Sequence, residues 1–403
     1  KVTHEDDFKK SDIVIINTCG FINDSKQESI DTILKCVELK NANKIKKILV
    51  TGCLSERYKD ELIKEIPEVD HFTGVNQLKE ILKHVGAEIR EEIIEQRTLT
   101  TPSHYAYLKI SEGCNRKCSF CAIPQIRGKY KSRTIESIIK EADFLSDKGV
   151  KELILIAQDT TYYGLDLYKK HELNNLLQNL EKIDKLKWIR LHYAYPAGFP
   201  TDILDTINNS EKICKYIDIP FQHISDHILS SMNRCFNSTD TYKLIDTIRE
   251  KIPGITIRTT LITGYPGETQ NDFNKLKDFV KNIEFERLGI FAYSHEENTT
   301  AYNLNDDVPE NIKLDRVEEI MNIQQEISLK HNQNLVGKTI KVIVDREEND
   351  FFIGRTQADS PDIDNEVLIS KDHYNINPGD FTDILVNSAD YFDISGEIHS
   401  LNI

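Results

Sequence analysis

Two short units at the start of the chain pair an apolar run with a helical pattern. Residues 13–17 read Ile-Val-Ile-Ile-Asn, which is typical of a buried parallel strand, and a helical stretch follows at 25–39. The same order recurs as an apolar run at 47–53 and a helical stretch at 56–65. Strand and helix twice over predict a small doubly wound α/β domain, which we place at residues 1–85. Cys19 and Cys53 should then lie at the carboxyl ends of neighbouring strands, where such sheets place ligands.

Six further apolar segments, each followed by a helical pattern, occupy the middle of the chain. They cover residues 105–110, 152–158, 188–195, 216–221, 256–264 and 287–294. Six strand–helix repeats predict a partial (β/α)6 barrel, two units short of the closed eight-stranded form. A charged stretch at 86–101 that precedes Pro102 predicts a linker in front of this barrel, which we place at 102–331.

The last part of the chain alternates short apolar segments with polar turns. A helical pattern at 309–331 closes the predicted barrel, and Asp, Asn, Pro and Gly then recur between short strands over residues 332–403. Strands at 339–344, 351–355 and 366–369 predict a small β-barrel of a size that is usual for an independent module. The predicted fold class is therefore α/β, arranged in three domains.

Composition narrows the functional classes. Hydrophobic residues make up 39% of the chain and charged residues 29%. No apolar run is long enough to span a bilayer and no signal peptide opens the sequence, so we expect a cytoplasmic protein without a membrane partner. Eight cysteines in such a chain favour metal ligation or redox chemistry over a disulfide framework.

The net charge of −15 is concentrated near the carboxyl terminus. Residues 336–403 hold fourteen Asp and Glu against five Lys and Arg. A module this acidic should repel phosphate backbones and attract a basic protein, so we expect no stable nucleic-acid binding through the small β-barrel. The alternative is that these carboxylates only solvate a surface.

Three cysteines at intervals of four and three, Cys114, Cys118 and Cys121, follow the first predicted barrel strand. The carboxyl ends of the strands form the active face of a parallel barrel. Three thiolates within eight residues can hold three irons of a four-iron cluster and leave the fourth iron open to a ligand. Zinc sites favour paired C-x-x-C motifs, and no second pair follows. The alternatives are a zinc knuckle or a chance group of buried cysteines.

This cysteine spacing in the first loop of a six-unit barrel resembles the radical S-adenosylmethionine superfamily. The resemblance implies a [4Fe-4S] cluster on the three cysteines, with S-adenosylmethionine bound at the open iron and cleaved to a 5′-deoxyadenosyl radical. Phe120 matches an aromatic position that lies near the adenine in that superfamily. The alternative for Phe120 is a core residue.

Four flanking motifs resemble the methylthiotransferases, whose domain order of methylthiotransferase domain, radical barrel and TRAM domain fits the whole chain. They lie at residues 17–22, 52–58, 219–226 and 264–269. The resemblance implies that Cys19 and Cys53 are two of three ligands of an auxiliary [4Fe-4S] cluster that delivers sulfur. The resemblance also implies a third ligand upstream of Cys19, in a segment absent from this sequence. The chain starts at Lys1 and its only methionines are Met232 and Met321, so we expect it to begin inside a longer protein.

Residues 19–22 and 26–30 are similar to the protein-modifying branch of this family, which implies an aspartate of small-subunit ribosomal protein twelve as the substrate. One S-adenosylmethionine would then methylate sulfur at the auxiliary cluster. A second would give the radical that takes hydrogen from the aspartate β-carbon before methylthio transfer. An electron donor and a sulfur donor are also required. The alternatives are a transfer-RNA methylthiotransferase and a non-catalytic ribosome-binding iron–sulfur protein.

Polar residues in the other barrel loops are candidates for binding S-adenosylmethionine. Gln158, Gln222, Arg258 and Glu268 could pair with its ammonium, carboxylate or ribose, and Gly264 could allow close backbone approach. The alternative is that these residues cap helices and tie loops together. We predict no acid–base catalyst. Three other cysteines match no cluster motif: Cys36, Cys214 and Cys235.

Overall fold

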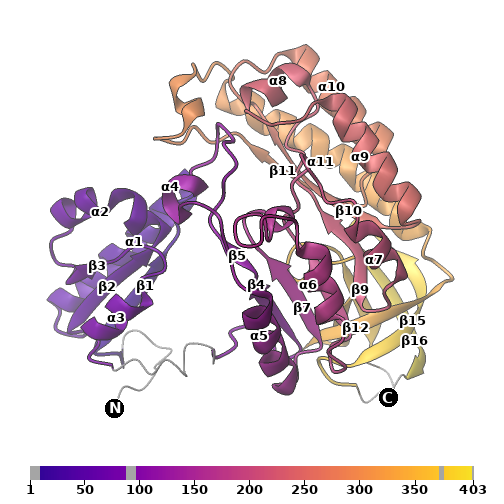
Figure 1. The fold of residues 1–403 in the computed structure, drawn as a ribbon, viewed down its shortest axis with the longest axis horizontal. Helices are drawn as coiled ribbons and strands as arrows, with labels where there is room; N and C mark the ends of the chain where they lie inside the picture. The colour runs from indigo at the N-terminus through magenta and orange to yellow at the C-terminus, as the bar shows by residue number, and fades with distance from the viewer. Residues whose placement is uncertain (1–9, 88–96, 372–375, 402–403) are drawn as a thin grey trace.

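The computed structural model describes residues 10–87, 97–371 and 376–401 (Figure 1). The N-terminal domain is a parallel sheet in the order β1-β2-β3, with one helix after each strand. Its elements are β1 (Ile13–Thr18), α1 (Asn23–Asn41), β2 (Lys47–Gly52), α2 (Cys53–Glu65), β3 (His71–Phe72) and α3 (Leu78–His84). The two predicted strand–helix units are confirmed. The third was not predicted, because a two-residue strand is too short to show a periodicity.

The central barrel is a six-stranded sheet with all neighbouring strands parallel, in the order β11-β10-β9-β8-β7-β4. Its strands are β4 (Tyr105–Lys109), β7 (Glu152–Ile156), β8 (Trp188–Leu191), β9 (Ile213–Asp218), β10 (Thr256–Thr263) and β11 (Arg287–Ala292). Every predicted strand is present, so the partial (β/α)6 barrel is confirmed. Most of the predicted linker, residues 88–96, lies outside the described residues.

Helices cover the outside of the central barrel, and the largest hydrophobic core lies between them and the strands. They are α5 (Ile135–Asp147), α6 (Leu173–Leu180), α7 (Ile203–Asn209), α8 (Asp226–Ser231), α9 (Ser238–Lys251), α10 (Gln270–Ile283) and α11 (Glu310–Gln333). Helices α9 and α10 begin at capping boxes made by Asn237 with Asp240 and by Thr269 with Asp272, which satisfy free N–H groups of the first turn.

A small hairpin interrupts the first strand–helix unit. Strand β5 (Ser111–Glu112) pairs antiparallel with β6 (Lys131–Ser132), and the short helix α4 (Ile123–Arg127) lies between them. The three cysteines 114, 118 and 121 lie on this excursion. Figure 1 shows α4 at the boundary between the central barrel and the N-terminal domain, and α4 contacts α2 there.

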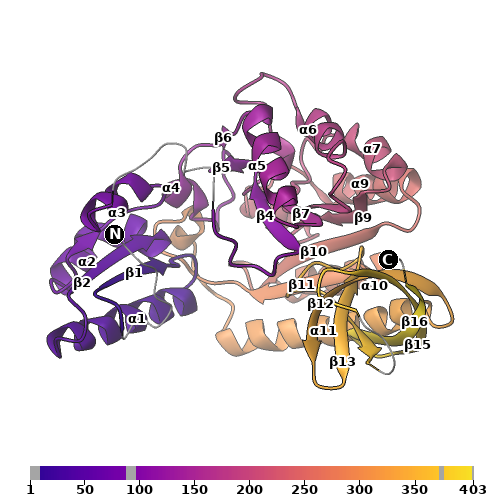
Figure 2. The ribbon, with the colours of Figure 1, turned by 90° about the horizontal axis from the view of Figure 1, so that it is seen from below.

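The C-terminal barrel is closed, in the order β12-β13-β14-β16-β15. Its strands are β12 (Thr339–Glu348), β13 (Phe351–Thr356), β14 (Glu366–Ser370), β15 (Phe381–Ala389) and β16 (Asp393–Leu401). Alternate residues point inward, and buried valines and isoleucines such as Val342, Val344 and Ile384 fill the barrel. The predicted β-barrel is therefore confirmed. Figure 2 shows it against the central barrel, on a different side from the N-terminal domain.

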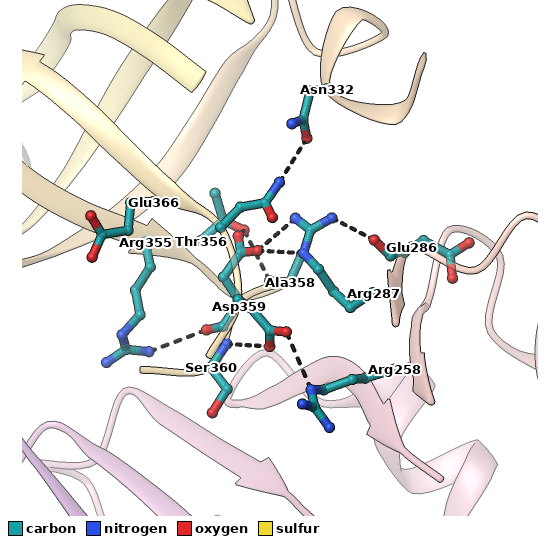
Figure 3. A network of polar contacts seen from close by, with 12 residues as sticks. Arg258, Glu286, Arg287, Asn332, Arg355, Thr356, Ala358, Asp359, Ser360 and Glu366 are labelled. Atoms are coloured by element: carbon teal, nitrogen blue, oxygen red, sulfur yellow. Dashed lines mark hydrogen bonds and ion pairs between the residues drawn. The ribbon is translucent and has the colours of Figure 1, made fainter. Parts of the chain in front are cut away.

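Arginines of the central barrel meet carboxylates of the C-terminal barrel in a buried contact (Figure 3). Arg287 on β11 donates from Nε to Asp359 Oδ1 at 2.7 Å. Arg258 on β10 donates from Nε to Asp364 Oδ1 at 3.3 Å. Both aspartates lie in the loop between β13 and β14. The loop thus supplies opposite charge to arginines that the barrel strands bury.

A second buried group lies at the start of β7. Glu152 accepts from Arg190 Nε at 2.9 Å and also forms an ion pair with Arg355 of the C-terminal barrel. Arg355 pairs in turn with Asp345 at 2.8 Å. Asp359 and Asp364 of the acidic terminal segment therefore neutralise arginines of the central barrel, and Asp345 also lies 2.8 Å from Nε2 of His104, just before β4. For Asp345, Asp359 and Asp364, the structure favours this architectural role over attraction of a basic partner.

No helix in the described part of the chain is both long enough and apolar enough to cross a membrane.

We predict that Arg287→Met lowers the free energy of unfolding by about 3–5 kcal/mol, because it leaves Asp359, which is 2% exposed, as an unpaired buried charge. Unfolding of the single and double variants by urea measures this. Adding Asp359→Leu should recover much of the loss, since both charges then disappear. The exposed Glu397→Gln serves as the matched control and should change stability by less than about 0.5 kcal/mol. Additive losses in the double variant would contradict a direct pairing.

Candidate active site

The cysteine loop begins with a glycine whose conformation no other residue adopts easily. Gly113 has φ +80°, and a Cβ placed on it would lie 2.3 Å from the carbonyl oxygen of Lys129. The next residue, Cys114, donates its backbone N–H to the carbonyl of Gly128 at 3.1 Å. The chain therefore passes close to the end of the hairpin and turns into the carboxyl-end mouth of the central barrel.

The three cysteines carry half-buried thiols. Burial raises the pKa of the Cys114 thiol to about 11 and that of Cys121 to about 12. Neither thiol ionises readily without a cation, so metal binding must displace protons from them.

Two arginines surround the cysteine site. Arg234 places Nη1 3.3 Å from Cys118 Sγ and donates from Nη2 to the carbonyl of Pro220. Arg116 pairs with Asp159 at 2.8 Å. Both guanidinium groups lie over the ring of Tyr195, at 4.3 Å for Arg234 and 4.0 Å for Arg116. The site thus combines thiolate ligands with fixed positive charge that offsets the negative charge of a bound cluster.

A cavity of about 450 Å³ opens beside the cysteines. Its wall includes all three cysteines together with Phe120, Gln158 and Gln222. The Oε1 atoms of both glutamines are buried and have no hydrogen-bond partner among the described residues. Buried oxygens without partners are rare and call for a donor, and S-adenosylmethionine brings an ammonium group and ribose hydroxyls. The cavity therefore fits this ligand in size and chemistry.

Two non-glycine residues of the cavity wall have left-handed backbone conformations. Tyr193 has φ +56° and Gln222 has φ +70°. Such conformations cost free energy and persist where the surroundings impose them. Asp218 holds the first through a hydrogen bond from the Tyr193 N–H at 3.0 Å, and its other oxygen accepts from Arg258 at 3.1 Å. The wall is thus tied to the same arginine that meets the C-terminal barrel.

The structure does not bring three of the predicted ligand-binding residues to the lining of this cavity. Arg258 lies between Asp218 and Asp364. Glu268 accepts from the Gly264 N–H at 2.7 Å and from Arg316 at 2.7 Å. Gly264 packs against the side chain of Lys313. Each of these three residues therefore has its partner inside the protein. This agrees with the alternative interpretation, in which they cap helices and tie loops together.

Sequence reasoning also missed several residues of the wall. Arg116, Tyr195 and Arg234 were not predicted, although the first lies between two of the cluster cysteines. Their spacing carries no motif, and their role depends on stacking across distant loops. Of the cysteines outside the motifs, Cys36 and Cys214 are buried in hydrophobic clusters, and Cys235 is exposed.

Cys19 and Cys53 lie at the carboxyl ends of neighbouring strands, as the sequence predicts. Strands β1 and β2 are parallel, and their last residues, Thr18 and Gly52, are register partners. Gly52 has φ +105°, and a Cβ there would lie 2.4 Å from the Thr18 carbonyl oxygen. Gly52 directly precedes Cys53, just as Gly113 directly precedes Cys114. Neither glycine could easily be replaced by another residue. Cys19 is exposed and Cys53 is half-buried.

The cysteine edge of the N-terminal domain meets the mouth of the central barrel. Arg127, the last residue of α4, donates from Nη2 to Cys53 Sγ at 3.3 Å. Phe21, two residues after Cys19, forms part of the wall of the cavity beside the three-cysteine site. Two separate groups of sulfur ligands therefore face one region of the molecule, although about sixty residues separate Cys53 from Cys114 in the sequence.

One other group of metal-ligand side chains lies in the N-terminal domain, away from these cysteines. His71, Glu80 and His84 place ligand atoms within 4.8 Å of one another. However, the two imidazole rings stack at 3.7 Å with 26° between their planes, and His71 already bonds Glu80 at 2.8 Å. Stacked rings cannot both point in-plane lone pairs at one ion. We assign this group to packing.

Comparisons with known families and structures agree with this site. Residues 108–280 match the radical SAM superfamily, 336–398 match the TRAM domain, and 1–74 match an uncharacterized protein family, UPF0004. A radical S-adenosylmethionine methyltransferase, TsrM from Kitasatospora setae, has a TM-score of 0.54 and 15% identity, covering 71% of this chain and 67% of its own. The cobalamin-dependent enzyme OxsB has a TM-score of 0.50 and 12% identity, covering 76% and 48%. Fold and site together define a radical S-adenosylmethionine enzyme.

Curated relatives are similar over almost the whole chain. Proteins named ribosomal protein uS12 methylthiotransferase RimO, from Christiangramia forsetii, Flavobacterium psychrophilum and Bacteroides thetaiotaomicron, are 53%, 54% and 50% identical. Each alignment covers 98% of this chain, and 87%, 91% and 91% of the respective relative. The chain belongs to the RimO family of radical S-adenosylmethionine methylthiotransferases. It is therefore a transferase whose cofactors are [4Fe-4S] clusters and S-adenosylmethionine.

We predict that Gln158→Ala and Gln222→Ala each raise the Kd for S-adenosylmethionine about tenfold, because each removes a buried acceptor for a donor on the ligand. Equilibrium dialysis with labelled S-adenosylmethionine on reconstituted protein measures this. Gln333→Ala, at the exposed end of α11, is the matched control and should leave the Kd unchanged. A Kd within twofold of the parent for both cavity variants would contradict their assignment to this ligand.

Proposed function

We propose that this chain transfers a methylthio group to the β-carbon of an aspartate in ribosomal protein uS12, in the cytoplasm. The observation that carries the proposal is the approach of two sulfur-ligand groups to one mouth, marked by Arg127 at Cys53 and by Phe21 in the cavity wall. Relatives that are 50–54% identical carry this activity in their names. A carrier of sulfur beside a site of radical formation is the arrangement that such a transfer needs.

The residues divide the work between the two domains. Cys114, Cys118 and Cys121 would hold one [4Fe-4S] cluster, and Cys19 and Cys53 would be ligands of the auxiliary cluster. When bound, these clusters and S-adenosylmethionine supply the reductive cleavage to a 5′-deoxyadenosyl radical and the methylthio group. The protein contributes binding, orientation and the exclusion of water.

The cavity orients S-adenosylmethionine through its own side chains. Gln158 and Gln222 accept hydrogen bonds from the ligand through the oxygens that have no partner in the protein. Phe120 packs on one side against a cluster that includes Tyr265 and Met232, and its exposed part faces the cavity where the adenine would lie. Arg234 lies beside Cys118, where its positive charge would offset the negative charge of a bound cluster.

A basic protein suits the charge of this chain better than an RNA does. The net charge of −15 opposes binding of a phosphate backbone and favours encounter with a ribosomal protein. We therefore expect no stable nucleic-acid binding through the C-terminal barrel. An electron donor and a sulfur donor must also reach the enzyme to complete a turnover.

The test is to reconstitute the full-length protein anaerobically, supply reductant, S-adenosylmethionine and sulfide, and weigh uS12 and transfer RNA after reaction. We predict a methylthio mass gain on an aspartate of uS12 and none on transfer RNA. Cys118→Ala should form 5′-deoxyadenosine only at the level of a reaction without enzyme, whereas the exposed Cys235→Ala should match the parent. Modification of transfer RNA alone would contradict the proposed substrate. Formation of 5′-deoxyadenosine by Cys118→Ala would contradict the assigned cluster site.

A further inference from the structure

We propose that Glu296 is a positioning residue that fixes the N-terminal domain on the central barrel, so that the sulfur-carrying cysteines face the radical site. This inference rests on the proposed function. Glu296 lies in the loop that follows β11, the last strand of the central barrel, and is 3% exposed. Figure 2 shows this loop, in orange, reaching the N-terminal domain beside α4.

Two cations from the N-terminal domain converge on the Glu296 carboxylate. Lys26 Nζ lies 2.9 Å and Arg57 Nη1 lies 3.4 Å from its Oε2 atom. The other oxygen accepts from the Ser294 hydroxyl at 2.7 Å, which orients the carboxylate from within its own loop. The side chain of Arg57 is 2% exposed, so this contact is largely removed from water. We call the group of Glu296, Lys26 and Arg57 the latch.

Arg57 joins the latch to both predicted cluster cysteines. Its Nη1 atom donates to the carbonyl of Gly20 at 2.6 Å, and Gly20 directly follows Cys19. Arg57 itself lies one helical turn after Cys53 on α2. Its Nη2 atom donates to the carbonyl of Glu297 at 2.7 Å, on the barrel loop. One guanidinium group therefore holds the Cys19 segment, the Cys53 helix and the central barrel together.

The segment that carries Cys19 has little room to adjust without the latch. A Cβ on Gly20 would lie 2.6 Å from the backbone of Leu54, so the loop after β1 rests directly on the start of α2. The contact of Arg127 with Cys53 lies on α4, and the latch contacts come from the loop after β11. The helix α4 and the loop after β11 are far apart in sequence, and together they fix the position of Cys19 and Cys53 relative to the central barrel.

Radical formation and methylthio transfer depend to different degrees on where the N-terminal domain lies. Cleavage of S-adenosylmethionine uses the three cysteines and the cavity, whose described lining comes from the central barrel except for Phe21. Transfer of the methylthio group needs the sulfur carrier near the substrate carbon, and a misplacement of about 1 Å can cost on the order of 10²-fold in rate. Loss of the latch should therefore allow radical formation while transfer to the substrate fails.

The test compares Glu296→Gln with the parent, using full-length reconstituted protein and uS12, and measures 5′-deoxyadenosine and methylthiolated product in the same reaction. We predict that 5′-deoxyadenosine forms within a few-fold of the parent while product falls about 10²-fold. Glu297→Gln is the matched control, because the Glu297 side chain is exposed and, in the described part of the chain, accepts a hydrogen bond only from the Tyr58 hydroxyl. It should change the ratio of the two products by less than about twofold.

Two further variants keep the test decisive. Lys26→Gln leaves Arg57 in place and should raise the ratio of 5′-deoxyadenosine to product in the same direction, by less. The double variant Arg57→Gln with Glu296→Gln should be no worse than the more severe single variant, because the two residues act as one contact. The proposal is overturned if the ratio of 5′-deoxyadenosine to methylthiolated uS12 is unchanged in Glu296→Gln and Lys26→Gln. It is also overturned if these variants lose 5′-deoxyadenosine and methylthiolated uS12 to the same extent. Failure of the parent to modify uS12 would instead contradict the proposed function.

Discussion

A parallel sheet places the carboxyl ends of all its strands at one edge and their amino ends at the other, and this constraint organises the whole molecule. At the carboxyl edge, loops from separate strands meet around the three cysteines and the cavity. The same edge receives the N-terminal domain through the loop after β11 and through α4. The three-cysteine site and the N-terminal domain therefore lie at the same edge of the sheet, because all six strands run in one direction.

Arginines in the first half of the central-barrel strands need partners of opposite charge, and the C-terminal barrel supplies these partners. The side chains of Arg258 and Arg287, on strands of the central barrel, are only 15% and 9% exposed, so an unpaired charge there would be costly. The β13–β14 loop supplies Asp359 and Asp364, so the acidic charge of this module is in part a structural complement to those arginines (Figure 3). Through Asp218, the same contact reaches the backbone of Tyr193 in the cavity wall.

The sequence was most informative where function depends on local spacing. The cysteine triad, the six strands and the edge positions of Cys19 and Cys53 follow from short patterns, and the structure has them as predicted. Gln158 and Gln222 lie in the cavity because they belong to the loops at the carboxyl ends of β7 and β9. From the sequence alone, Arg258 and Glu268 are as good candidates for ligand binding as the two glutamines. In the structure they pair instead with Asp364 and Arg316, which lie far away along the chain and could not be foreseen as partners. The latch was missed for the same reason, since Lys26 and Arg57 lie far from Glu296 along the chain. The hairpin of β5 and β6 was missed because two-residue strands show no periodicity.

The most direct test of the account is the fate of one hydrogen atom. In a reaction of reconstituted enzyme with uS12 that carries deuterium at the β-carbon of its aspartates, the account predicts deuterium in the 5′-deoxyadenosine that forms with the methylthiolated product. That result would join the radical at the three-cysteine site to the carbon that accepts sulfur. Methylthiolated uS12 accompanied by 5′-deoxyadenosine without deuterium would contradict it.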